Sequence, residues 1–180
     1  MSLEIVIGPM FSGKTTYAIS YIQRQQSINK RVVTIKPNID NRYSNQSVLI
    51  THNKYAVPCL VWDVSIPLYI PQEMLNAECI VIEEAQFFTG LIPIVKSLLF
   101  KHRKHILLVG LDGDANQAPF GEILHCIPFA TKLLKLEALC TTCKDGSPAH
   151  YSKKNPSDMI DEQIDVGGPD KYSAVCLKHL

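Results

Sequence analysis

The chain has 180 residues, 46% of them hydrophobic, which is enough for one main domain with a packed core and at most a small appendage. Lys and Arg number 18 against 17 Asp and Glu, so no global basic field indicates nucleic acid as a partner. Because no apolar run approaches the roughly 20 residues of a membrane span and no secretory signal is visible, we expect a cytoplasmic protein without a membrane partner.

The first predicted element is a short β-branched strand at residues 3–7, followed directly by the pattern G-x-x-x-x-G-K-[ST] and a plausible helix. This pattern is typical of a phosphate-binding loop, whose glycines let backbone N–H groups converge on a polyphosphate. Its lysine reaches the outer phosphates and its threonine can bind Mg²⁺. The candidate nucleotide-binding residues are Gly8, Pro9, Met10, Phe11, Ser12, Gly13, Lys14 and Thr15. The alternative is a glycine turn with a surface lysine.

Further elements alternate along the chain. We expect strands at 31–36, around 57–61, at 78–82 and at 105–110, a polar loop at 38–53, and helices near 72–76 and 92–100. Residues 123–139 suggest a short helix and a strand. This order predicts an α/β protein with a P-loop (RecA-like) parallel sheet flanked by helices. Ligands of such sheets bind at the carboxyl ends of the strands, where the glycine loop and two other motifs fall.

Two acids, Glu83 and Glu84, end the apolar strand predicted at 78–82. A carboxylate at this position is the usual partner of a phosphate-binding loop and binds Mg²⁺ directly or through water. On an extended chain the two side chains point to opposite sides, so we expect different roles for them. One can face the metal while the other takes a proton from a substrate hydroxyl. The alternative is a pair of solvated acids at a strand end.

The C-terminal part carries two knuckles of the same spacing, Cys140-x-x-Cys143 and Cys176-x-x-His179. Together they supply four ligands of the types that zinc binds tetrahedrally. A structural zinc would make residues 144–175 a loop anchored at its base, so we expect domains at 1–139 and 140–180, the second a small zinc-ribbon-like lasso. The alternatives are a redox C-x-x-C or unrelated thiols. The remaining cysteines have apolar neighbours and are interpreted as core thiols: Cys59, Cys79 and Cys126.

Taken together, these motifs resemble the type II thymidine kinases, the family of cellular cytosolic and poxvirus enzymes. The resemblance covers residues 3–179. It rests on the glycine loop with its Pro-Met-Phe-Ser insert, the stretch 40–43, Thr51-His52, the stretch 84–88, Leu111-Asp112-Gly113 and the stretch 119–121. It also rests on Cys140-x-x-Cys143, Cys176 and the stretch 167–172.

The resemblance implies transfer of the γ-phosphate of ATP to the 5′-hydroxyl of thymidine, with Mg²⁺ and a structural zinc. It makes Glu84 the general base and Arg42 a contact to the phosphates. Glu83 stands where the family usually has Asp and would assist the metal, with Asp40 in support. Gln86 joins the residues expected around the cofactor.

For the nucleoside, the resemblance implies a pocket beneath the lasso. Backbone groups from 164 to 167 would bind the base edge, and apolar side chains would line the pocket. Ala115 stands where the family often has an aromatic residue, and His179 replaces the usual fourth cysteine. The expected substrate-binding residues are Met10, Phe87, Leu111, Ala115, Phe120, Ile164, Asp165, Val166, Gly167 and Tyr172.

Two other functions remain open from the sequence alone: a P-loop ATPase or switch that phosphorylates nothing, and a zinc-ribbon protein that binds nucleic acid. The near-neutral charge counts against the second. The resemblance further implies deoxyuridine as a second substrate, inhibition by the end product dTTP, and a homo-oligomer, most often a tetramer.

Overall fold

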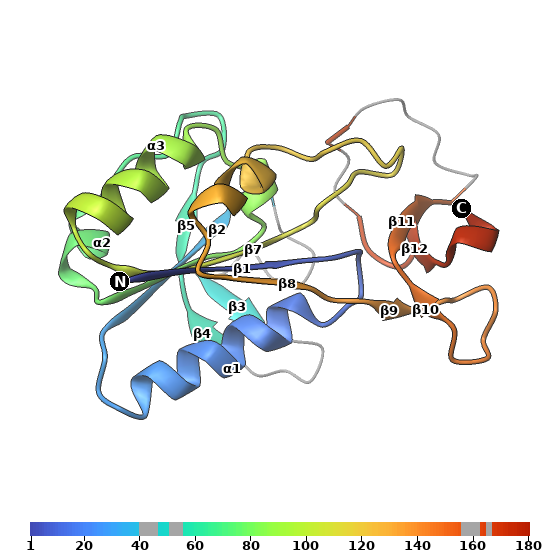
Figure 1. Ribbon diagram of the computed structural model, residues 1–180, viewed down its shortest axis with the longest axis horizontal. Coiled ribbons are helices and arrows are strands. Elements are labelled where there is room, and N and C mark those ends of the chain that lie inside the picture. Colours follow the sequence, from blue (N-terminus) through green and yellow to red (C-terminus); the bar gives the residue numbers. More distant parts are fainter. Residues whose placement is uncertain (40–46, 51–55, 156–162, 165–166) are drawn as a thin grey trace.

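The central element is a six-stranded sheet in which all neighbouring strands are parallel (Figure 1). The computed structural model describes residues 1–39, 47–50, 56–155, 163–164 and 167–180. From one edge to the other the strands are β5 (Leu60–Trp62), β2 (Val32–Pro37), β6 (Cys79–Ile82), β7 (His105–Gly110), β1 (Ser2–Ile7) and β8 (Lys132–Lys135). The predicted parallel α/β fold is therefore confirmed.

Both faces of the sheet are covered because its central strands are apolar on both sides. Leu3, Ile5 and Ile7 of β1 face one core together with helices α2 (Gln72–Asn76) and α3 (Leu91–Lys96). Val6 faces the opposite core, which includes Ala18 of α1 (Lys14–Gln26). This alternation follows from the twofold side-chain period of a strand. Figure 1 shows α2 and α3 on one side of the sheet and α1 on the other.

Two short helical segments continue these layers. The π-helical turn η2 (Ser97–Lys101) extends α3, and the 3-10 helix η3 (Ile123–Phe129) precedes β8. The expected helices at 72–76 and 92–100, and the helix and strand within 123–139, are thus present. Among the described residues, none of the helices combines the length and the apolar character that crossing a membrane requires.

The prediction of a single strand around 57–61 is wrong in one respect, because two strands occupy this region. β4 (Ala56–Pro58) pairs with β3 (Val48–Ile50) in a separate antiparallel sheet, whereas β5 joins the central sheet. The two strands serve different cores: Val57 packs with the α1 side and Trp62 with the α3 side. The presence of β3 also corrects the expectation that 38–53 is loop throughout.

The C-terminal unit lies beyond the carboxyl end of β1 (Figure 1). It contains two antiparallel pairs, β9 (Ala138–Leu139) with β10 (Pro148–Ala149) and β11 (Tyr151–Lys154) with β12 (Tyr172–Val175). The 3-10 turn η5 (Leu177–His179) ends the chain. Residues 144–175 are therefore not a loop throughout, because their small core of Ala149, Ala174 and Val175 supports paired strands.

Candidate active site

The glycine loop connects the carboxyl end of β1 to the first residue of α1. Gly8 has φ 146°, and a Cβ atom there would lie 2.4 Å from the backbone oxygen of Leu136, so no larger residue fits. Gly13 precedes α1 in the left-handed region with φ 84°. The buried Lys14 side chain folds back over the loop, where its Nζ donates to the Pro9 oxygen at 2.5 Å and to Ser12 Oγ at 3.3 Å. The glycine loop therefore curls around the Lys14 ammonium group.

Thr15 and Glu83 connect the loop to the neighbouring strand end. The Thr15 hydroxyl donates to Glu83 Oε1 at 2.5 Å, and Glu83 is almost completely buried at the end of β6. A hydroxyl and a carboxylate next to a phosphate cradle are the oxygen ligands that Mg²⁺ uses in phosphate-loop proteins. These residues therefore fit a Mg²⁺ ion on chemical grounds.

Glu84 has a different environment from Glu83. Its backbone is left-handed, with φ 51°, so the extended geometry expected for the acidic pair is wrong at this position. The turn sends the Glu84 carboxylate toward Gln86, whose Nε2 donates to Glu84 Oε2 at 2.6 Å. The other end of the Gln86 amide accepts the backbone N–H of Leu111 at 3.0 Å. Gln86 thus holds Glu84 in place relative to the end of β7.

Close packing around Gln86 leads to a testable prediction about Gly121. Gly121 has φ 63°, and a Cβ atom there would lie 2.0 Å from the backbone oxygen of Gln86. We expect Gly121→Ala to lower the free energy of unfolding by on the order of 3 kcal/mol, because backbone must move. Gly146→Ala is the matched control: its φ is 88° but nothing lies within 4 Å, so only the left-handed strain of about 1 kcal/mol applies. Urea unfolding measures both, and equal losses would contradict the packing argument.

A pocket opens beside Glu84 and encloses about 460 Å³ of space, part of it open to solvent. The rings of Phe87 and Phe120 meet edge to face in its wall, with centroids 5.4 Å apart. The structure brings these predicted substrate residues together in the wall: Met10, Phe87, Leu111, Ala115, Phe120, Gly167 and Tyr172. Ile164 is half exposed and is not part of this wall. Asp40, Arg42, Asp165 and Val166 lie outside the described residues.

Four further wall residues were not among the sequence predictions: Gly113, Asp114, Ser152 and Gln163. Ser152 belongs to β11 of the C-terminal unit, and its Oγ accepts the backbone N–H of Met10 at 2.9 Å. This bond connects the phosphate loop directly to the C-terminal unit. A single serine carries no sequence signal for such a contact, although Ser152 lies within the expected lasso.

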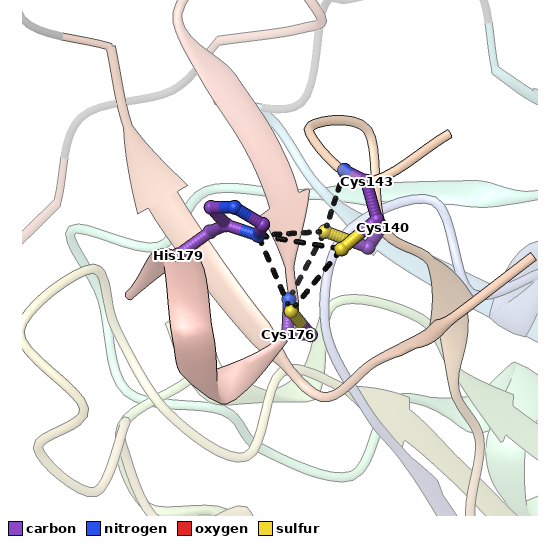
Figure 2. A group of neighbouring side chains, drawn as sticks. All are labelled: Cys140, Cys143, Cys176 and His179. Carbon is purple, nitrogen blue, oxygen red and sulfur yellow. Dashed lines mark hydrogen bonds between the residues drawn. The ribbon is translucent and has the colours of Figure 1, made fainter. Parts of the chain in front are cut away.

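The four predicted zinc ligands form one cluster (Figure 2). His179 Nδ1 lies 3.4 Å from the Sγ atoms of both Cys143 and Cys176 and 3.7 Å from Cys140 Sγ, and the two former sulfurs are 3.7 Å apart. Sulfur and nitrogen ligands about 2.0–2.3 Å from a tetrahedral zinc lie roughly 3.5–3.8 Å from one another. The donor set and its spacing therefore fit one structural zinc.

The electrostatics of Cys140 also favour a metal. The backbone N–H groups of Cys143 and Cys176 donate to Cys140 Sγ at 3.5 and 3.4 Å. These donors, the Cys143 N–H foremost, lower the pKa of the Cys140 thiol to about 6. A thiolate is the form that binds zinc, so this cysteine is prepared for ligation near neutral pH.

The fold and site define a class of protein: a phosphate-loop nucleotide-binding enzyme with a pocket beside a buried carboxylate, built partly by a C-terminal unit that carries a cluster of three cysteines and a histidine. A family model described as thymidine kinase matches residues 1–180, and the chain belongs to the thymidine kinase family. A thymidine kinase of Choristoneura fumiferana entomopoxvirus is 35% identical over 98% of this chain and 94% of its own. A thymidine kinase of Coprothermobacter proteolyticus is 34% identical over 98% of this chain and 89% of its own. Thymidine kinase a of Arabidopsis thaliana is 34% identical over 99% of this chain and 74% of its own.

Proposed function

We propose that this protein phosphorylates thymidine, transferring the γ-phosphate of ATP to the nucleoside 5′-hydroxyl in a nucleotide salvage reaction. One observation carries the proposal: adjacent residues at the end of β6 face two different sites. Glu83 bonds Thr15 of the phosphate loop, whereas Glu84 lines the neighbouring pocket. A donor phosphate and an acceptor hydroxyl would therefore meet at this strand end, as phosphoryl transfer requires.

On the donor side, the loop N–H groups and Lys14 hold the phosphates of ATP. Thr15 and Glu83 would hold Mg²⁺, which would offset the negative charge of the phosphates. Arg42 is expected to contact the transferred phosphate and Asp40 to support it, although both lie outside the described residues. Gln86 is expected near the cofactor, and its bond to Glu84 also fixes the position of that carboxylate.

On the acceptor side, Glu84 takes the proton of the 5′-hydroxyl as the hydroxyl attacks. Its position in the pocket wall, held by Gln86, allows this role. The apolar wall, with Met10, Phe87 and Phe120, surrounds the nucleoside and excludes water. Backbone groups of 164–167 bind the base edge, and deoxyuridine, which lacks only a methyl group, is the expected second substrate.

The C-terminal unit, which begins with β9, closes the acceptor side of the site; the expected domains 1–139 and 140–180 put their boundary at the end of that strand. Zinc held by the four-ligand cluster would order this unit, and the bond between Ser152 and Met10 joins it to the α/β part. The protein is further expected to be cytoplasmic, to form a homotetramer and to be inhibited by dTTP. Light scattering and a dTTP titration of activity measure the last two.

A nucleoside panel tests this function. With ATP and Mg²⁺, thymidine and then deoxyuridine should stimulate ADP formation, whereas purine deoxynucleosides should not, because the Phe87 and Phe120 rings in the pocket wall limit the space for a larger base. ADP formation that no nucleoside changes would instead support a P-loop ATPase.

A further inference from the structure

Asp114 is a buried carboxylate in the wall of the proposed nucleoside pocket, and its orientation is fixed. It follows β7, and its Oδ1 atom accepts the backbone N–H groups of Asn116 and Ala118, each at 2.9 Å. These bonds close a tight turn around the carboxylate. The second oxygen, Oδ2, accepts a hydrogen bond from the side-chain Nε2 of Gln163 at 2.7 Å, although the two residues are 49 positions apart in the sequence.

The bond to Asp114 determines which way the Gln163 amide faces. An ionised carboxylate only accepts hydrogen bonds, so the NH₂ end of the amide must point toward it. The backbone oxygen of Pro119, a second acceptor, lies 3.5 Å from the same Nε2 atom. The carbonyl end, Oε1, therefore faces away from both. Within the described part of the chain, Oε1 has no hydrogen-bond partner, and Gln163 lines the pocket.

We propose that Asp114 is a positioning residue that holds the Gln163 Oε1 atom as a hydrogen-bond acceptor for the pyrimidine base. Thymine and uracil carry a donor at ring position N3, whereas cytosine carries an acceptor there. The pair therefore selects thymine and uracil and disfavours cytosine, because two facing acceptors repel each other and form no hydrogen bond. This inference rests on the proposed function, since it takes the pocket to hold a nucleoside.

The substitution Asp114→Asn should reverse the orientation of the Gln163 side-chain amide. The new side chain keeps one oxygen for the N–H groups of Asn116 and Ala118 but turns an NH₂ group toward position 163. Gln163 must then accept with Oε1 and present its own NH₂ to the pocket. One hydrogen bond corresponds to about tenfold in affinity. We therefore expect the KM for thymidine to rise about tenfold and that for deoxycytidine to fall about tenfold, with kcat for thymidine and the KM for ATP changed less than about twofold.

Two further variants separate this role from a merely structural one. Adding Gln163→Glu to Asp114→Asn restores an acceptor, because the new carboxylate binds the Asn amide with one oxygen and keeps the other for the base. This combination should return the thymidine KM to within about threefold of the parent value. Gln163→Ala alone, at an exposed position that does not threaten folding, should raise the thymidine KM about tenfold.

Matched controls are available in the same chain. Asp63 also accepts a backbone N–H two residues onward, from Ser65 at 3.0 Å, but is not part of the pocket wall, so Asp63→Asn should change no kinetic constant. Gln26→Ala, at the exposed end of α1, is the control for Gln163→Ala.

The outcomes distinguish the inference from the proposed function. A parent protein that phosphorylates no nucleoside would overturn both. If the parent is active but Gln163→Ala leaves the ratio of kcat/KM for thymidine over deoxycytidine within about twofold, the inference falls and the function stands.

Discussion

Glu84→Gln is expected to lower kcat for thymidine phosphorylation by about a thousandfold, within the range that a positioned general base contributes. The amide has the shape of the carboxylate but cannot take the proton of the 5′-hydroxyl. The KM for ATP should change little, because the proposed contacts to ATP come from the glycine loop and Lys14. Steady-state kinetics with purified protein measures both constants.

Glu4→Gln is the matched control for Glu84→Gln. Glu4 is a partly buried carboxylate that bonds Tyr17 and Lys132, and it lies outside the pocket wall. Its substitution should leave kcat unchanged. If Glu84→Gln retains activity within a few-fold of the parent, Glu84 is not the base, and the proton must leave by another route.

Loss of the zinc site should have the second-largest effect. The parent is expected to carry about one zinc per chain, and Cys143→Ser or chelation should remove it, because tetrahedral sites of this kind need all four ligands. We expect the thymidine KM to rise more than about tenfold, since Ser152 and Tyr172 of the pocket wall belong to the C-terminal unit that carries the four-ligand cluster. Metal analysis and thymidine titration are the measurements.

The ATP side provides the internal comparison for this prediction. The glycine loop connects β1 to α1, and the Met10–Ser152 bond joins it to the C-terminal unit. The KM for ATP should therefore rise far less than that for thymidine. Cys126→Ala, which removes a buried core thiol, should keep the zinc. Metal-free protein with unchanged affinity for thymidine would contradict the role of zinc.

Strands β1, β2, β6 and β7 could be predicted from the sequence because each is rich in apolar, often β-branched residues, most of which are buried in the sheet. The shorter strands could not. β11 has the sequence Tyr-Ser-Lys-Lys and becomes a strand only because β12, about twenty residues later, pairs with it. Such pairing is a property of the folded C-terminal unit and leaves no periodic signal in the sequence.

The same contrast holds for the site. Glu83 and Glu84 could be identified because they follow an apolar strand at the edge where ligands bind. The left-handed turn at Glu84, which separates their environments, has no signal in the residue type. Asp114 and Gln163 were missed because their contact joins two polar loops, where such residues are ordinary.

Transfer of label from γ-labelled ATP tests the central claim most directly. Incubated with thymidine and Mg²⁺, the protein should place the label on the nucleoside 5′-oxygen, yielding labelled dTMP and unlabelled ADP in equal amounts. Release of the label as free phosphate, at a rate that thymidine does not alter, would contradict the account.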